Sequence, residues 1–331
     1  MQTQFEKKKY KVPKKIKMFG NQNPWVWCLE PTFGCNLKCG HCCARLLPSG
    51  EYTYMTKEHW IDAWKIIAEV GPTARVDLCG YVGEPSLHPD IVEFIKIARE
   101  ISPLSQIQMT TNGTMLRTKK VNYKELLDSG LNIVYTDQYG SKEVFEKLAD
   151  ESGYDWYRYY DKPKNAPSPW TYVGPDLKVI VLQEQPENWP DSRFKAGLLG
   201  NWYGNLDWEA GKRFKMKPLE KPLTRRCNQP FLYAVISAEG KYLLCCQDGM
   251  QATKDMFGTV ADGVEGFKRF WFGKEMQTVR RRLRNKDRAS TLYACAKCNV
   301  TFSRCDFRHW TDEQVEVYYD GKEMVEFESK K

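Results

Sequence analysis

Three cysteines, Cys35, Cys39 and Cys42, are grouped in one short CxxxCxxC segment. This spacing is too tight for a hairpin of disulfides and suits three thiolates around one face of an iron–sulfur cube. Three protein ligands leave one iron of a four-iron cluster open, and an open metal position is typical of catalytic sites rather than structural ones. The segment therefore predicts a reactive cluster. A structural zinc site completed by His41 or Cys43 is the alternative.

Three strand-like apolar runs each end in a polar segment, and the order of these segments is informative. Residues 25–31 lead into the cysteine segment, 76–79 lead into 80–90, and 107–109 lead into 110–114. Residues 82–85, Val-Gly-Glu-Pro, look like a GGEP motif with Val82 in place of the first glycine. Together, and in this order, the segments resemble the radical S-adenosylmethionine (SAM) superfamily.

The resemblance implies a SAM site beside the cluster. It places Gly83 and Glu84 against the methionyl amino group, with Glu84-Pro85 fixing the turn. A glycine lets the backbone approach a ligand closely, although an ordinary strand-to-helix turn is the alternative. The threonine and asparagine of the third segment either bond the ribose or cap the next helix. The cofactor-binding candidates are His41, Gly83, Glu84, Pro85, Thr111 and Asn112.

Helical and strand-like patterns alternate along the first part of the chain. The apolar spacing predicts helices over 56–70, 88–101, 123–129 and 142–150, and further strands over 131–136 and 177–182. This alternation predicts an α/β fold of parallel βα units with right-handed crossovers. The resemblance implies a partial (β/α)6 TIM-like barrel, whose sites lie at the carboxyl ends of its strands. The aromatic-rich segment 154–174 is expected to be an irregular loop, with a stacking surface for a planar substrate as the alternative.

A second set of cysteines follows in the last third of the chain. An apolar run and a turn at Glu239-Gly240 predict a hairpin before Cys245, and Cys295 and Cys298 form a CxxC knuckle. The region resembles the SPASM/twitch extension of radical SAM enzymes. Because few cysteines remain, the shorter twitch form with one auxiliary four-iron cluster is expected. The expected ligands are Cys227, Cys245, Cys295 and Cys298, with Cys246 or Cys305 as substitutes and structural zinc as the alternative.

The remaining cysteines and the acidic residues beside the motifs have no partner pattern in the sequence. Cys28, Cys43 and Cys79 are interpreted as buried hydrophobic residues. Glu30, Asp137 and Asp248 are expected to be solvated. No general base is assigned.

Four regions are expected. They are a basic tail (1–24), the barrel (25–200), the small hairpin and helix domain that holds the auxiliary cluster (201–310) and an acidic C-terminal segment (311–331). The net charge of +8 is concentrated in residues 1–17 and 268–288. These patches suit nucleic acid, or are solvated surfaces.

No apolar run approaches the roughly 20 residues that a membrane span needs, and the basic N-terminus lacks the apolar region of a secretory signal. Twelve cysteines without such a signal indicate a reducing compartment, so a cytoplasmic location without membrane association is expected. The oligomeric state is not predicted.

The resemblance implies that a reduced cluster cleaves SAM and that the 5′-deoxyadenosyl radical removes hydrogen from a small molecule or nucleobase, which is then oxidised or rearranged. It also implies an electron donor such as a flavodoxin or ferredoxin. The alternatives are modification of a base within DNA or RNA, maturation of a peptide, and a non-enzymatic zinc-binding interaction protein.

Overall fold

The computed structural model describes residues 23–79, 82–137, 142–153, 157–158, 170–173, 176, 178–183, 200–210 and 214–300. They belong to one compact unit, Asn23–Ser303. Nearly all of the basic tail, the whole acidic C-terminal segment, Cys305 and most of segment 154–174 lie outside the described residues. The expected region boundaries therefore stay predictions.

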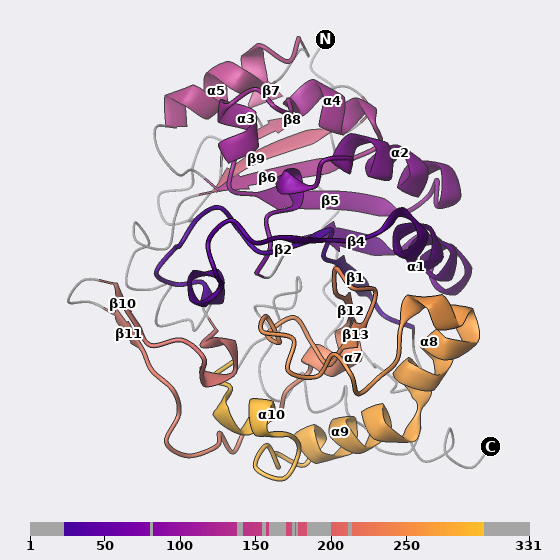
Figure 1. The fold of residues 1–331 in the computed structure, drawn as a ribbon, viewed down its shortest axis with the longest axis vertical. Helices are drawn as coiled ribbons and strands as arrows, with labels where there is room; N and C mark the ends of the chain where they lie inside the picture. Colours follow the sequence, from indigo (N-terminus) through magenta and orange to yellow (C-terminus); the bar gives the residue numbers. More distant parts are fainter. Residues whose placement is uncertain are drawn as a thin grey trace, which may run out of the picture. The chain divides into compact units, whose positions relative to one another are not determined.

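Nine strands of the described residues form one sheet, in the order β13-β12-β1-β4-β5-β6-β9-β8-β7 (Figure 1). The parallel strands are β1 (Val26–Leu29), β4 (Arg75–Leu78), β5 (Gln106–Thr111), β6 (Ile133–Asp137), β9 (Val179–Gln183) and β12 (Tyr233–Ile236). The antiparallel edges are β13 (Tyr242–Leu243), β8 (Trp170–Val173) and β7 (Tyr157–Arg158). Two small antiparallel pairs accompany the sheet: β2 (Thr32–Phe33) with β3 (Thr53–Tyr54), and β10 (Trp208–Ala210) with β11 (Phe214–Met216).

The helices of the first part connect successive parallel strands, and Figure 1 shows α1, α2 and α4 following one another along the sheet. They are α1 (Lys57–Val70), α2 (Ile91–Ile101), α3 (Thr114–Arg117), α4 (Tyr123–Asp128) and α5 (Lys142–Asp150). The last part contains α7 (Gln229–Leu232), α8 (Gly263–Phe272), α9 (Lys274–Arg284) and α10 (Tyr293–Lys297). The short 3₁₀ turns are η1 (Cys43–Leu46), η2 (Pro85–Leu87), η5 (Trp202–Gly204) and η6 (Val260–Asp262). In the described part of the chain, no helix has both the length and the apolar character to cross a membrane.

The two faces of the sheet differ in character. Alternate residues along β1, β4, β5, β6 and β9 face the helices and enter one apolar core: Trp27, Leu29, Val76, Leu78, Ile107, Met109, Val134, Ile180 and Leu182. The intervening positions form a more polar face. Here Arg75 and Asp77 make a two-pronged ion pair of 2.8 and 3.0 Å. The apolar face holds the helices, and the polar face is available for chemistry.

The expected α/β fold with a partial barrel of parallel strands and a C-terminal cysteine-bearing part is confirmed. Helix α2 begins at Ile91 rather than at residue 88, because Pro85–Leu87 forms a separate turn. The expectation that 154–174 is wholly irregular is wrong, since β7 and β8 pair there. The stacking surface falls on side chains outside the described residues and stays a prediction.

The hairpin of the second cysteine region is part of the main sheet. β12 and β13 pair as expected, with Gly240 in the left-handed conformation at φ 72°. β12 also pairs in parallel with β1, which matches Ile236 with Leu29. The barrel and the C-terminal cysteine region therefore share backbone hydrogen bonds and one core.

A shared core predicts that damage to β12 destabilises the whole unit. Ile236 is fully buried in the core, and we expect Ile236→Ala to lower the free energy of unfolding by about 3 kcal/mol. Leu104→Ala is the control, because Leu104 is 69% exposed and should change stability little. Urea unfolding under anaerobic conditions, followed by circular dichroism and tryptophan fluorescence, should show one shifted transition. Two transitions, of which only one moves, would contradict the shared core.

Candidate active site and auxiliary metal centre

The CxxxCxxC loop follows the short strand β2, which comes directly after β1, and its three cysteines are half-buried. The Sγ of Cys35 accepts hydrogen bonds from the backbone N–H of Leu37 at 3.4 Å and from Nδ2 of Asn112 at 3.5 Å. The Sγ of Cys42 accepts from the N–H of Ala44 at 3.4 Å. Burial raises the pKa of the Cys35 thiol to about 11, and the N–H of Leu37 opposes this rise. Cluster binding at this loop must therefore release protons.

Glu84 joins the three sequence segments of the site. Its Oε1 accepts from the N–H of Ser86 at 3.0 Å, from the Ser86 hydroxyl at 2.6 Å and from the Thr111 hydroxyl at 2.6 Å. Its Oε2 accepts from the N–H of Asn112 at 2.7 Å, and its own N–H donates to the carbonyl of Gly34. Burial raises the pKa of this carboxyl. Both oxygens are engaged by the protein, so Glu84 positions the other segments around the cysteine loop.

Gly83 is required for a reason that the sequence did not reveal. A Cβ at this position would lie 1.5 Å from the carbonyl oxygen of Thr32 in β2. The glycine thus permits close approach of two protein backbones, whereas the sequence suggested close approach to a ligand. Pro85 is buried at the start of η2 and rigidifies the same turn.

Asn112 caps the next helix, which is one of the two roles considered for it, and it also contacts the cysteine loop. Its Oδ1 accepts from the N–H of Thr114 at 2.9 Å and so supports the start of α3. Its Nδ2 donates to Oδ1 of Asn36 at 2.9 Å and to the Cys35 sulfur. Thr111 is buried, and its hydroxyl lies between Glu84 and the N–H of the following turn. Both residues therefore lie beside the cluster loop.

His41 is covered by residues from the segment after the barrel. Its ring packs edge-on against Trp208 at a centroid distance of 5.6 Å. Its backbone carbonyl accepts from Nε1 of Trp202 at 3.1 Å. At Gly40, an added Cβ would lie 2.1 Å from Nε1 of Trp208. The two tryptophans shield the middle of the cysteine loop.

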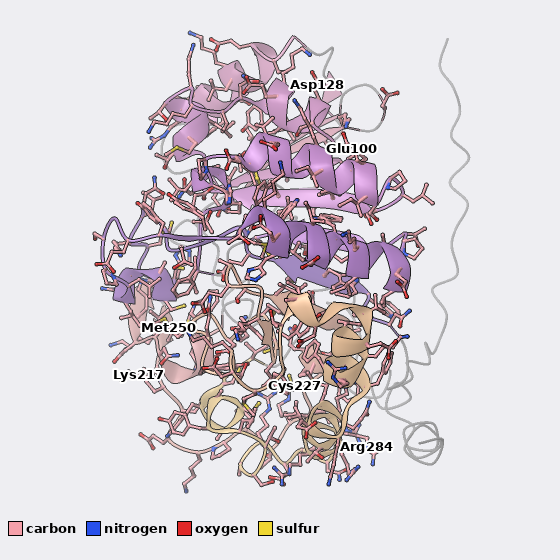
Figure 2. The ribbon with its side chains drawn as sticks, turned by 45° about the vertical axis from the view of Figure 1, so that its right-hand side comes forward. Glu100, Asp128, Lys217, Cys227, Met250 and Arg284 are labelled. Carbon is pink, nitrogen blue, oxygen red and sulfur yellow. The ribbon has the colours of Figure 1, made fainter. Side chains whose placement is uncertain are left out.

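The four expected auxiliary ligands line one cavity. Cys227 precedes α7, Cys245 follows β13, Cys295 lies in α10 and Cys298 ends it. Figure 2 shows Cys227 among the elements of the C-terminal part, with Arg284 at the end of α9. Burial raises the pKa of Cys245, of Cys295 and, to about 11, of Cys298. The topology thus brings together four thiols that are 71 residues apart at their extremes.

Four polar side chains that the sequence did not assign to this centre line the same cavity. They are Tyr203, Gln229, Gln247 and Arg288. The hydroxyl of Tyr203 lies 2.9 Å from the Sγ of Cys245. Both side-chain polar atoms of Gln247 are buried, and neither has a hydrogen-bond partner among the described residues. The sequence could not identify Tyr203 as part of the site, because residues 201–206 indicated only the boundary between two expected regions.

Cys246 faces a different cavity, which it shares with Cys28, Cys79 and Glu30. Its Sγ donates to Oε1 of Gln229 at 3.3 Å. The geometry therefore favours its neighbour Cys245 as the auxiliary ligand. Cys28 and Cys43 are buried as expected, whereas Cys79 is half-buried.

Two of the three acids expected to be solvated are buried. Glu30 is 6% exposed and accepts from Nε2 of Gln251 at 3.1 Å, and burial raises its pKa to about 8. Asp248 is 1% exposed and accepts from the N–H groups of Ala252 and Thr253. Asp137 ends β6 on the polar face and is half-buried. This burial raises its pKa to about 7, and the interaction with His41 opposes the rise. The expectation of solvation is wrong for Glu30, which the later segment with Gln251 covers, and for Asp248, which its own local turn engages.

Both cysteine sets suit iron–sulfur clusters in donor chemistry, since such clusters take cysteine thiolates. The orphaned amide of Gln247 also fits a group with sulfur acceptors in the four-cysteine cavity. In the part of the chain that the structure describes, no group of three or more His, Cys, Asp or Glu is arranged to hold a single metal ion.

Two family models match the chain. The radical SAM superfamily matches residues 29–166, and the SPASM iron–sulfur cluster-binding domain matches residues 227–299. The chain belongs to the radical SAM superfamily and is an enzyme with a SPASM iron–sulfur cluster-binding domain. Its cofactors are accordingly a 4Fe–4S cluster with SAM, and auxiliary iron–sulfur chemistry in the SPASM domain. This membership replaces the non-enzymatic zinc alternative.

Two curated relatives match part of the chain. The 7,8-dihydro-6-hydroxymethylpterin dimethyltransferase of Methanocaldococcus jannaschii is 32% identical over 119 residues, which is 35% of this chain and 22% of the relative. The GTP 3′,8-cyclase of Aquifex aeolicus is 30% identical over 125 residues, which is 36% of each chain. The chain therefore spans between about a fifth and just over a third of these relatives.

The solved structure of BtrN in complex with AdoMet and 2-DOIA is similar in fold, with a TM-score of 0.61 and 19% identity. The match covers 84% of this chain and 94% of BtrN. BtrN in an open conformation matches with a TM-score of 0.53 and 14% identity, over 86% of this chain and 99% of that one. At these identities the likeness shows the fold alone.

The contact between Gly83 and Thr32 makes a sharp prediction. A methyl group in Gly83→Ala would clash with backbone, which cannot rotate away, so the cysteine loop must shift. We expect a loss of about 3 kcal/mol in stability and a loss of iron from the first site after anaerobic reconstitution. Gly71→Ala is the control, because its Cβ would meet Ala74 at 3.4 Å, Trp27 at 3.6 Å and the carbonyl of Ile67 at 4.0 Å, which are ordinary van der Waals distances. Full iron content and unchanged stability in Gly83→Ala would contradict the packing described here.

The buried carboxyl of Glu30 predicts a pH-dependent stability. Its pKa is raised from 4.5 to about 8, so between these values the folded protein binds a proton that the unfolded chain releases. Stability therefore falls as pH rises through this window. We measure the free energy of unfolding in urea at pH 6 and at pH 9. The difference between Glu30→Gln and the wild type should shift in favour of the variant by about 2–3 kcal/mol from pH 6 to pH 9. Glu100→Gln, at an exposed position of α2 (Figure 2), should show no such gain. If the free energy of unfolding differs between Glu30→Gln and the wild type by the same amount at both pH values, the raised pKa of Glu30 is contradicted.

Proposed function

We propose that this enzyme oxidises a small molecule or nucleobase at an unactivated C–H position. When bound, the cofactors supply a 5′-deoxyadenosyl radical, which takes a hydrogen atom from the substrate, and an iron–sulfur electron acceptor. In this proposal the first cluster is held by Cys35, Cys39 and Cys42, and the auxiliary cluster is held by Cys227, Cys245, Cys295 and Cys298.

The observation that carries the proposal is the cavity lined by four cysteines. Four thiolates complete the ligand set of a four-iron cluster, so no iron is left for a substrate atom. A closed cluster of this kind can exchange electrons. After loss of a hydrogen atom, a substrate that also loses a proton and one electron has undergone a net two-electron oxidation. Acceptance of that electron favours oxidation over rearrangement.

The chain's own residues prepare the first site for this chemistry. Glu84 fixes Thr111 and Asn112 beside the cysteine loop. Trp202 and Trp208 cover the middle of this half-buried loop and shield part of it from water. These contacts support the assignment of Gly83, Glu84, Pro85, Thr111, Asn112 and His41 to the SAM site, in which Gly83 and Glu84 organise the backbone.

A second candidate function is modification of a base within DNA or RNA. The supporting observation is an exposed basic surface on α8, α9 and the turn that follows. It consists of Lys268, Arg269, Lys274, Arg281, Arg282 and Lys286. Arg280 and Arg288 of the predicted patch are buried, so this surface carries fewer charges than the sequence indicated.

The enzyme needs a reductant and a substrate. We propose a flavodoxin or ferredoxin as the electron donor. We also propose a cytoplasmic location, because twelve cysteines and oxygen-sensitive clusters suit a reducing compartment.

The deciding experiment measures 5′-deoxyadenosine formation by the anaerobically reconstituted enzyme with a small-molecule or a macromolecular fraction of cell extract. We expect the small-molecule fraction to stimulate it at least tenfold. Stimulation by the macromolecular fraction that nuclease abolishes would establish the nucleic-acid alternative, and protease sensitivity would establish peptide maturation. No SAM cleavage by enzyme with intact clusters would overturn the proposal.

Cysteine variants separate the two clusters. Cys35→Ala with Cys39→Ala and Cys42→Ala should lose about half of the iron and all SAM cleavage. Cys245→Ala with Cys298→Ala should retain SAM cleavage but lose the oxidised product. An unchanged yield of product in the second variant would favour rearrangement.

A further inference from the structure

The cavity for the auxiliary cluster is surrounded by hydrogen-bond donors from three separate segments. Tyr203 comes from η5, Gln247 follows the hairpin, and Arg288 follows α9. Each is nearly or fully buried: Tyr203 is 5% exposed, and the other two are 1% exposed. Donors collected from such distant parts of the chain indicate a built environment for an anionic group.

The hydroxyl of Tyr203 can only donate a hydrogen bond to a cysteine sulfur that binds iron. It lies 2.9 Å from the Sγ of Cys245. A cysteine that binds iron is a thiolate and has no proton to give, so the hydroxyl donates. A hydrogen bond to a charged acceptor is about twice as strong as one between neutral groups.

Gln247 has a donor that the described protein does not use. Its Nε2 and Oε1 are both buried without a hydrogen-bond partner among the described residues, and the side chain lines the four-cysteine cavity. Gly200 leaves room for this amide, because a Cβ there would lie 1.8 Å from Oε1 of Gln247. An unpaired buried amide is costly. A cluster sulfur in the cavity would accept the hydrogen bond from Nε2.

The backbone at Tyr203 is held in a conformation that side chains other than glycine rarely adopt. Trp202 has φ 50° and Tyr203 has φ 60°. Each such residue costs about 1–2 kcal/mol. The turn keeps this conformation while it directs the Tyr203 hydroxyl to Cys245 and the Trp202 ring to the first cysteine loop.

Arg288 adds a buried positive charge to the lining of the four-cysteine cavity. Its guanidinium donates to the carbonyl of Cys298 at 3.1 Å and to that of Val300 at 2.7 Å. The charge therefore lies beside the CxxC knuckle.

We propose that Tyr203 and Gln247 are positioning residues that raise the reduction potential of the auxiliary cluster and so make it an electron acceptor. Hydrogen bonds to cluster sulfurs stabilise the more negative, reduced state, as does a nearby cation. The inference rests on the proposed ligand set and deepens the proposed function, but the potential can be measured without any substrate.

The test is a redox titration of the full-length, reconstituted enzyme, followed by electron paramagnetic resonance. We expect Tyr203→Phe and Gln247→Leu each to make reduction of the auxiliary cluster about tenfold less favourable. For a one-electron couple this lowers the midpoint potential by about 59 mV. The potential of the first cluster in the same sample should stay unchanged.

Tyr242→Phe is the matched control. Tyr242 is fully buried, its hydroxyl has no partner among the described residues, and its ring stacks on Phe270 at 4.6 Å. Its loss should leave both potentials unchanged. Unchanged auxiliary potentials in Tyr203→Phe and Gln247→Leu, at full iron content, would overturn the proposal.

Cys298→Ala identifies the auxiliary signal, which should be lost or altered in this variant. If both cluster signals persist unaltered, the ligand set is wrong and the inference fails with it. If the potentials shift as expected but no substrate is oxidised, the inference stands and the proposed function fails.

Discussion

The structure depends on one strained turn, η5, because its neighbouring side chains reach the two cysteine centres. The indole of Trp202 donates to the carbonyl of His41, inside the first cysteine loop. The hydroxyl of Tyr203 contacts the sulfur of Cys245 in the second centre. Asn201 and Asn299 each donate a backbone N–H to the other's side chain, which ties the turn to the CxxC knuckle. The separation of the two centres is thus set by adjacent residues of one turn and by the strand pairing of β12 with β1.

The first centre is organised by the buried carboxylate of Glu84. Glu84 accepts hydrogen bonds from three residues, and each of its oxygens has a partner in the protein. Gly83 lets this segment lie directly on β2. Residues of a SAM-binding motif can therefore act on the protein rather than on the cofactor. The cysteine loop and Asn112 gain their positions from this network, and loss of one link should disturb them together.

Local pattern was sufficient to predict the parallel strands, most helix positions and the first cysteine loop, because each depends on spacing within a short segment. The second cysteine set spans 71 residues, and it was expected from the resemblance to the SPASM/twitch extension. Contacts between distant segments were not predictable. Nothing local to 233–236 indicates that β12 pairs with β1, and nothing near Gly83 reveals Thr32 as its neighbour. Asp248 is held by a local turn through the N–H groups of Ala252 and Thr253, which its sequence did not reveal. Glu30 looked solvated because its partner, Gln251, lies far away in the sequence. The contacts of Tyr203 were missed for the same reason.

The two centres differ in electrostatics in a way that suits opposite directions of electron flow. At the first, burial raises the pKa of Cys35, and the charge of Glu84 adds to the rise. At the second, burial raises the pKa of Cys295 and of Cys298, but Arg288 opposes it. A negative neighbour disfavours an added electron, and a positive neighbour favours it. The first cluster is therefore expected to be the stronger reductant, as reductive cleavage of SAM requires. With the proposed ligand set, the second cluster is expected to be the better acceptor, because Tyr203, Gln247 and Arg288 offer it hydrogen bonds and a positive charge in place of water.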